Sequence, residues 1–131
     1  MSGFQGVWSL TEHFQQINDD WQTYITPYVV FAGGFDGSDG VNVMEYITVT
    51  STGNTQDFGD LAGNTRECAG CSSSTRGIVA GGQTTSNINV IQYITIATTG
   101  NTTDFGDLLA ARHRAAGCSN ATRGLFMGGE T

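Results

Sequence analysis

The chain is poor in basic residues, in proline and in paired cysteines. It has 5 Lys and Arg against 12 Asp and Glu, with one Pro and three Cys among 131 residues. Nucleic-acid binding needs clustered Lys and Arg to neutralise phosphates, so the net charge of −7 argues against nucleic acid and against anionic membrane surfaces as partners. An odd number of cysteines argues against a disulfide framework and indicates free thiols made in a reducing compartment.

Long hydrophobic runs are also missing. No apolar stretch approaches the roughly 18 residues of a membrane span. No basic start leads into an apolar run at the N-terminus, as it does in a secretory signal. The sequence therefore predicts synthesis in a cytoplasm without membrane insertion. With 38% hydrophobic residues the chain has enough apolar material for the core of one domain.

What the sequence does contain is a repeat with a period of 47 residues, in which Asn42–Gly82 matches Asn89–Gly129. Internal periods of this length indicate repeat architectures. A third double glycine, Gly33 and Gly34, lies one residue out of phase with the period. The other positions expected to maintain the repeated fold are Tyr46, Phe58, Cys71, Arg76, Gly81 and Gly82, and in the second copy Tyr93, Phe105, Cys118, Arg123, Gly128 and Gly129.

Each unit is predicted to hold four short strands separated by turns. Apolar runs that end in Gly-Gly, where we expect either a close backbone approach or positive φ angles, are followed by β-branched runs, Asp-Phe-Gly-Asp-Leu segments and cysteine-containing runs. The apolar runs are residues 29–32, 77–80 and 124–127, and the β-branched runs are 41–50 and 88–97. The Asp-Phe-Gly-Asp-Leu segments are 57–61 and 104–108, and the cysteine-containing runs are 67–73 and 115–121. Four strands in a unit of this length are typical of a propeller blade.

The N-terminal residues follow a helical period instead. Spacings of four and three residues place one set of apolar side chains on a single helix face, and Ser9 with Glu12 forms a capping-box pattern. These apolar residues are Leu10, Phe14, Ile17, Trp21 and Tyr24. We expect residues 1–27 to form either a docking arm between proteins, to which Trp8 adds apolar area, or a helix packed on the chain's own β domain. The β repeat domain then covers 28–131, with repeats at about 35–82 and 83–129.

The repeated residues carry a resemblance to known proteins. An Arg, an apolar strand, Gly-Gly, a Tyr and then an aromatic residue resemble the kelch motif, with Phe58 and Phe105 where that motif has Trp. More narrowly, NVIQYITIATTGNTTDFGDL and RAAGCSNATRG resemble repeats in structural proteins of cyanophages and related marine tailed phages. The segment Gly6–Leu10 (GVWSL) resembles the start of tail-associated proteins in such phages.

This resemblance implies an all-β fold of two kelch-like propeller-blade repeats behind a short N-terminal helical arm. It also implies a non-enzymatic virion structural protein, associated with the tail or tail fibre and made in the host cytoplasm. Alternative functions are a host receptor or glycan-binding module of a tail fibre, which would serve host attachment, and a capsid decoration protein. The expected partners are other copies of the chain, other phage virion proteins and, for the alternative, a host surface glycan or receptor.

Two units do not close a propeller, which has about four to eight blades. An open arrangement leaves apolar faces and strand edges in water, where they promote association. We therefore expect a homo-oligomer, and favour a trimer whose two-blade chains complete one ring. Two alternatives stay open: the chain is a fragment of a longer array, or the units stack in another β arrangement.

No cofactor, metal or catalytic site is expected. Cys68 and Cys71 have the spacing of half a zinc site but lack a second Cys or His pair, and Cys71 and Cys118 are interpreted as small buried hydrophobic residues. Asp36 and Asp39 suggest a calcium loop, but without the bidentate Glu of an EF-hand a solvated turn is favoured.

The remaining polar residues also have structural interpretations. The Asp pairs at 57/60 and 104/107 recur with turn residues, which favours backbone capping over acid–base chemistry. Arg76 and Arg123 are expected to hydrogen-bond between strands or blades, with a charge that faces a ligand as the alternative. His13 and His113 are isolated in the sequence, and no nucleophile or phosphate-binding motif is present, so we expect no enzyme.

Overall fold

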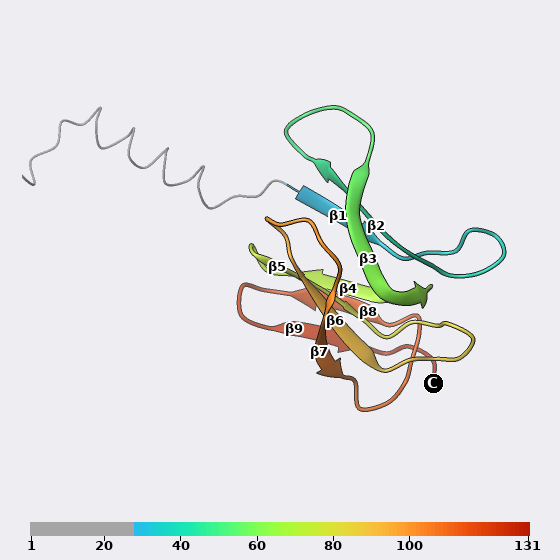
Figure 1. The fold of residues 1–131 in the computed structure, drawn as a ribbon. Coiled ribbons are helices and arrows are strands. Elements are labelled where there is room, and N and C mark those ends of the chain that lie inside the picture. Colours follow the sequence, from blue (N-terminus) through green and yellow to red (C-terminus); the bar gives the residue numbers. More distant parts are fainter. Residues whose placement is uncertain (1–27) are drawn as a thin grey trace, which may run out of the picture.

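The computed structural model describes residues 28–131, which form nine antiparallel strands in three small sheets (Figure 1). The first sheet has the order β1-β2-β3, made of Tyr28–Ala32, Val41–Thr48 and Gln56–Thr65. The second has the order β4-β5-β6-β7, made of Ala69–Ser72, Arg76–Ala80, Val90–Thr95 and Thr103–Asp107. The third pairs β8 with β9, made of Ala116–Ser119 and Gly124–Met127.

The all-β class predicted from the sequence is confirmed, and each predicted strand segment contains a strand. Every sheet is a meander in which consecutive strands are neighbours, and none of the sheets closes on itself. The predicted helix over residues 9–24 lies outside the described residues. Within residues 28–131, no helix is long and apolar enough to cross a membrane.

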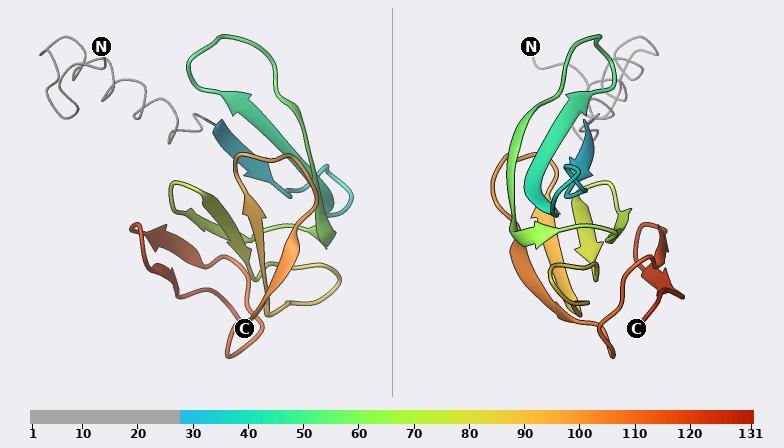
Figure 2. Two further views of the ribbon diagram at one scale, coloured as in Figure 1. Left: turned by 60° about the vertical axis from the view of Figure 1, so that its left-hand side comes forward. Right: turned by 90° about the vertical axis from the view of Figure 1, so that its right-hand side faces the viewer.

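The three sheets follow one another in space in the order of the chain, as the two views of Figure 2 show. Strand β4 of the second sheet packs against β8 of the third, and these two strands are the same Ala-Gly-Cys-Ser segment of successive repeats. Strands β1, β5 and β9 are likewise equivalent segments of the three units, since a double glycine directly follows each of them. Each sheet with its loops is called a unit below.

The main hydrophobic core lies between the first and second units. Met44, Phe58 and Leu61 from the first unit and Ile94 from the second are all buried in one cluster. Partly buried residues pack against this cluster, namely Val30, Ala32, Tyr46 and Val79. A single-layer sheet cannot bury a face by itself, so the core forms where two units meet.

Strand alternation gives the first sheet two different faces. Val30 and Ala32 face the core, whereas Val29 and Phe31, one residue away on β1, are 41% and 52% exposed. Val43 on β2 is exposed to a similar extent, 45%. The outward face of this sheet therefore exposes these apolar side chains beside Glu45, which lies opposite Phe31, and the described residues do not cover it.

The two copies of one phenylalanine test this description. Phe58 is 2% exposed and Phe105, its equivalent in the next unit, is 53% exposed. Phe58→Ala should lower the free energy of unfolding by about 3–5 kcal/mol because it empties a core position. Phe105→Ala should cost less than about 1 kcal/mol. Denaturant unfolding measures both values, and equal losses would contradict the placement of the core.

Candidate functional site

The most distinctive feature of the structure is the junction at which one unit binds the next. Residues at equivalent positions contact each other directly across it. The Arg114 N–H donates to the Glu67 carbonyl at 2.9 Å, and these residues lie 47 positions apart. The hydroxyl of Ser119 donates to the Ser72 carbonyl at 2.6 Å and accepts from the Ser72 N–H at 3.1 Å, again across 47 positions. Successive units therefore stack in register.

Small residues allow the inner strands β4 and β8 to approach backbone to backbone. A Cβ atom at Gly117 would overlap the carbonyl of Gly70, its equivalent in β4. A Cβ at Gly124 would lie 2.8 Å from the Cys71 sulfur. Stacking of the second and third units therefore requires glycine at Gly117 and Gly124.

The double glycines connect each unit to the segment that leads into the next. Gly34 donates its N–H to the Thr65 carbonyl at 2.9 Å, and Gly82 donates to Arg112, the equivalent of Thr65, at 2.8 Å. The first glycine of each pair is left-handed, with φ angles of 66°, 62° and 67° at Gly33, Gly81 and Gly128. This confirms the positive φ angles predicted from the sequence. The second glycines, which include Gly129 with a φ of 87°, share the feature.

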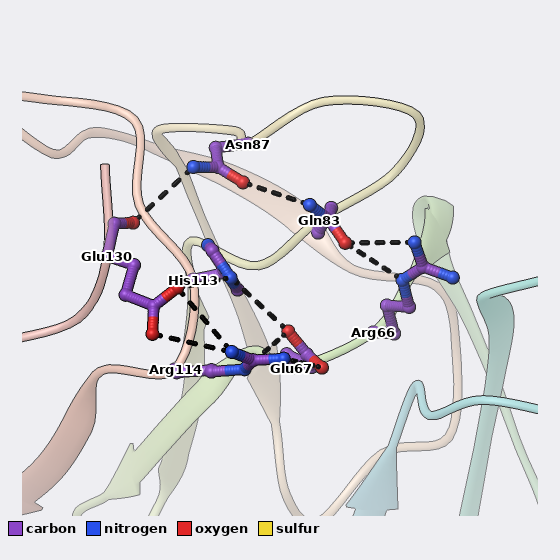
Figure 3. Close-up of polar contacts among 7 residues, drawn as sticks. All are labelled: Arg66, Glu67, Gln83, Asn87, His113, Arg114 and Glu130. Carbon is purple, nitrogen blue, oxygen red and sulfur yellow. Dashed lines mark hydrogen bonds and ion pairs between the residues drawn. The ribbon is translucent and has the colours of Figure 1, made fainter.

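A charged cluster links the second junction (Figure 3). Arg114 Nε lies 3.0 Å from Glu67 Oε2, and Arg114 Nη1 lies 3.4 Å from Glu130 Oε1. His113 is 8% exposed, and its Nε2 lies 3.5 Å from a carboxylate oxygen of each glutamate. The sequence interpretation of His113 as isolated is therefore wrong, because folding brings residues from three separate segments around it.

The backbone of this cluster repeats a motif of the preceding unit. Arg66 and Gln83 exchange two backbone hydrogen bonds at 3.0 and 2.8 Å, and His113 and Glu130 exchange the equivalent pair at 3.0 and 2.9 Å. Gln83 Oε1 also accepts from Arg66 Nη2 at 2.9 Å. Only the side chains differ, so an amide in one unit is replaced by a carboxylate in the next.

Asn87 joins these two pairs. Its Oδ1 accepts from Gln83 Nε2 at 3.3 Å, and its Nδ2 donates to the Glu130 carbonyl at 3.4 Å (Figure 3). The polar residues of both units thus form one continuous network. Most of these side chains pair with one another, but the buried Nδ1 of His113 has no hydrogen-bond partner among the described residues.

Opposite charges control the electrostatics of this network. The hydrogen bond from Arg114, with its positive charge, lowers the pKa of the Glu67 carboxyl below its usual range. The same contact with Glu67 raises the pKa of Arg114. Glu67 and Arg114 also have φ angles of 56° and 57°, a left-handed conformation uncommon outside glycine. Both residues thus share a turn geometry that stacks their backbones while pairing their charges.

The first junction has a different polar anchor. Gln92 is 3% exposed, and its Oε1 accepts from the Ala62 N–H of the preceding unit at 2.9 Å and from the Thr102 hydroxyl at 2.6 Å. Thr102 also donates its N–H to the Asp60 carbonyl at 2.9 Å. Gln92 is not among the site residues predicted from the sequence. An amide within a β-branched strand is the signal that could have identified it.

The repeated Asp pairs contribute through their backbone. The Asp60 N–H donates to Asn101 Oδ1 at 3.0 Å, and Gly100 donates its N–H to the carbonyl of Phe58, beside Asp57, at 2.7 Å. Asp57 and Asp60 lie within β3, as Asp104 and Asp107 lie within β7. Within residues 28–131 none of these carboxylates caps a backbone N–H, so the predicted capping role is wrong.

The repeated aromatic residues pair across strands. Tyr46 and Phe58 meet edge to face with ring centroids 5.8 Å apart, and Tyr93 and Phe105 repeat this contact at 6.1 Å. The Arg76 guanidinium lies 4.3 Å from the Tyr93 ring centroid, which is a cation–π contact between β5 and β6. This contact takes the place of the hydrogen bond expected for Arg76.

The side chain of Arg123 makes no contact of the Arg76 kind within the described part of the chain. Arg123 is exposed and uses its backbone N–H, which donates to Asn120 Oδ1 at 2.8 Å.

The cysteines differ from one another in burial. Cys71 is half-buried, but Cys118 is exposed, so the prediction that both are buried hydrophobic residues is wrong for Cys118. Burial raises the pKa of the Cys68 thiol, which makes it a poor nucleophile at neutral pH. In the described part of the chain, no three His, Cys, Asp or Glu side chains gather as a metal site would require.

The acidic loop before β2 is a solvated turn, as predicted. Asp36 Oδ1 accepts from the N–H groups of Ser38 and Asp39 at 2.8 and 2.9 Å, and from the Ser38 hydroxyl. These hydrogen bonds, with the one from Asp39 the largest contribution, lower the pKa of Asp36 to about 2. The carboxylate is therefore used within the turn.

A cavity of about 410 Å³ lies between the first and second units. Its lining is mostly apolar and includes Val30, Met44, Ile78 and Val79. The lining also includes polar residues, among them Gln92 and Thr102, whose side chains hydrogen-bond to each other at 2.6 Å. A ligand site normally offers convergent polar groups to its ligand, so we interpret the cavity as a gap in the packing between the two units.

The predicted docking residues all belong to the N-terminal segment 1–27. Trp8, Leu10, Phe14, Ile17, Trp21 and Tyr24 all lie outside the described residues. Comparison with known proteins adds no assignment, since no protein-family model and no curated protein matches the chain.

The Glu67–Arg114 contact predicts a pH dependence. A carboxyl with a lowered folded pKa stabilises the fold above its unfolded value of 4.5, and this contribution is lost as the pH falls through the folded pKa. Glu67→Gln should therefore lower the stability at pH 7 and converge with the native protein at strongly acidic pH. Arg114→Ala should raise the Glu67 pKa in an NMR titration, whereas Arg123→Ala, a control, should not. An unchanged pKa in Arg114→Ala would contradict the assignment.

Backbone stacking predicts that equivalent glycines respond differently. Gly117→Ala forces a Cβ into the Gly70 carbonyl, which is overpacking and should cost about 1–3 kcal/mol of stability. Gly70→Ala is the matched control, because its Cβ would meet only the Ile78 carbonyl, at 3.7 Å. Thermal unfolding of both variants measures the difference. A Gly117→Ala variant as stable as Gly70→Ala would argue against close stacking of β4 and β8.

Proposed function

We propose that this chain is a non-enzymatic structural protein of a tailed-phage virion, associated with the tail or tail fibre. It acts through homo-oligomeric assembly and through docking to other virion proteins. The observation that carries the assembly role is the direct binding between equivalent residues of successive units, such as Glu67 with Arg114 and Ser72 with Ser119. A surface that binds its own repeat is suited to building an extended or closed body from many units.

We also propose that each unit is a blade of a kelch-like propeller. The second sheet supports this, because its four strands form a meander in the order β4-β5-β6-β7. Strand β4 at one edge of that sheet packs against the matching strand β8, as inner strands do around a propeller axis. A trimer of such chains is the favoured closed form.

The proposed phage origin depends on the resemblance of the repeat sequence to repeats in phage virion proteins. A structural role without catalysis is supported by the polar side chains at the junctions, most of which pair with one another. In particular, Arg114 faces two carboxylates, and Gln92 is occupied by contacts with both Ala62 and Thr102. Residues 1–27 are proposed to dock to neighbouring virion proteins through their periodic apolar residues.

Localisation in assembled particles tests the proposal. Antibodies against residues 28–131 should label purified particles of the encoding phage at the tail or its fibres by electron microscopy. Mass spectrometry of the same particles should detect the chain at several copies per virion. Labelling of the capsid would favour the decoration role, and absence from washed particles would overturn the virion assignment.

A further inference from the structure

We propose that two exposed faces of this chain are the two halves of one head-to-tail interface between copies. The head face is the outward side of the first sheet, where the apolar side chains of Val29, Phe31 and Val43 lie beside Glu45. The tail face is the outward side of the third sheet, formed by Cys118, Leu125 and Met127. The inference rests on the proposed homo-oligomeric assembly and specifies the surface that performs it.

The tail face is formed by residues equivalent to those of a face that is covered inside the chain. The position of Leu125 is taken by Ile78 in the second unit and by Val30 in the first. The position of Met127 is taken by Ala80 and Ala32, as the order of residues before each double glycine shows. In the first unit, Val30 and Ala32 pack against the core shared with the second unit. In the third unit, Leu125 and Met127 are 56% and 50% exposed. The side that elsewhere receives the next unit is thus uncovered.

The head face matches the opposite half of the same junction. The second unit contacts the core of the first through Val79, whose equivalent is Phe31. Gly77 lies against Ile94 on the same side of the second sheet, and its equivalent is Val29. Phe31 is 52% exposed in the first unit, where no described residue takes the place of a preceding unit.

A second copy is the occupant because the chain already contains this contact in its internal form. The first unit binds the second through the face that carries Val30, and the second unit binds the first through the face that carries Val79. Each copy exposes one further face equivalent to each of these, the tail face with Leu125 and the head face with Phe31. The exposed versions are also larger than the internal ones, with Phe31 for Val79 and Met127 for Ala80, so they offer more apolar area. Different patches meet in such a contact, so it is heterologous and gives rings or filaments.

Complementation between two variants tests the interface. Phe31→Asp damages only the head face, and Met127→Asp damages only the tail face. By light scattering, the native chain should be multimeric, whereas each variant alone should have the monomer mass of 13.8 kDa. An equal mixture should give a dimer and nothing larger, because one intact tail then meets one intact head. Leu109→Asp is the control, since Leu109 is 107% exposed and outside both faces, and it should stay multimeric.

Each alternative gives a different result. A monomeric native chain, or multimers in both variants, would overturn the interface. A dimer formed by either variant alone would show a patch that binds itself. If Phe31→Asp lowers the melting temperature but leaves the multimer intact, residues 1–27 of the same chain cover the head face, and the inference is wrong.

Two further measurements keep the result interpretable. Circular dichroism checks that each variant is folded, and Val29→Asp with Leu125→Asp forms a second pair if either first variant is not. Particle labelling separates the two proposals. If the chain is present in virions but its variants show no complementation, the virion role stands and this interface is wrong. If the variants complement each other but particles are not labelled, the interface stands and the virion role is wrong.

Discussion

The structure depends on contact between the backbones of equivalent strands in successive units. Each unit is a single sheet, too thin to bury either of its faces, so Met44 and Phe58 are buried only because a second unit covers them. At that junction Gly59 lies so close to Gly100 that a Cβ atom would overlap the Gly100 carbonyl, and Gly117 approaches Gly70 in the same way where the third unit meets the second. Stability is therefore shared between neighbours, as in repeat proteins whose folding energy lies in nearest-neighbour interfaces.

Apolar packing holds the units together, and directional bonds determine how they are placed. Hydrophobic contact alone tolerates sliding, because it scales with area and has no preferred direction. The hydrogen bonds from Ala62 to Gln92, from Thr102 to the Asp60 carbonyl and from Arg114 to Glu67 restrict both the spacing and the rotation of one unit on the next. A buried amide such as Gln92 also has to be satisfied, which disfavours any other register.

The repeat made most of the fold predictable. Strand positions, the all-β class and the positive φ angles of Gly33 and Gly81 all follow from local turn chemistry and β-branched runs. Contacts across a junction did not follow, because they depend on how two units are rotated against each other. His113 and Gln92 were missed for that reason. The exposure of Cys118 was also unpredictable, since it is set by whether another unit covers that sheet and not by its own segment.

One pair of residues limits how such an array can change. Glu67 and Arg114 occupy the same place in successive units, and their opposite charges meet when the units stack. An exact tandem duplication of either unit would set Glu against Glu or Arg against Arg, which repel. This repulsion disfavours any change that makes the two repeats identical at this position. The difference between the repeats there specifies which unit can stack on which.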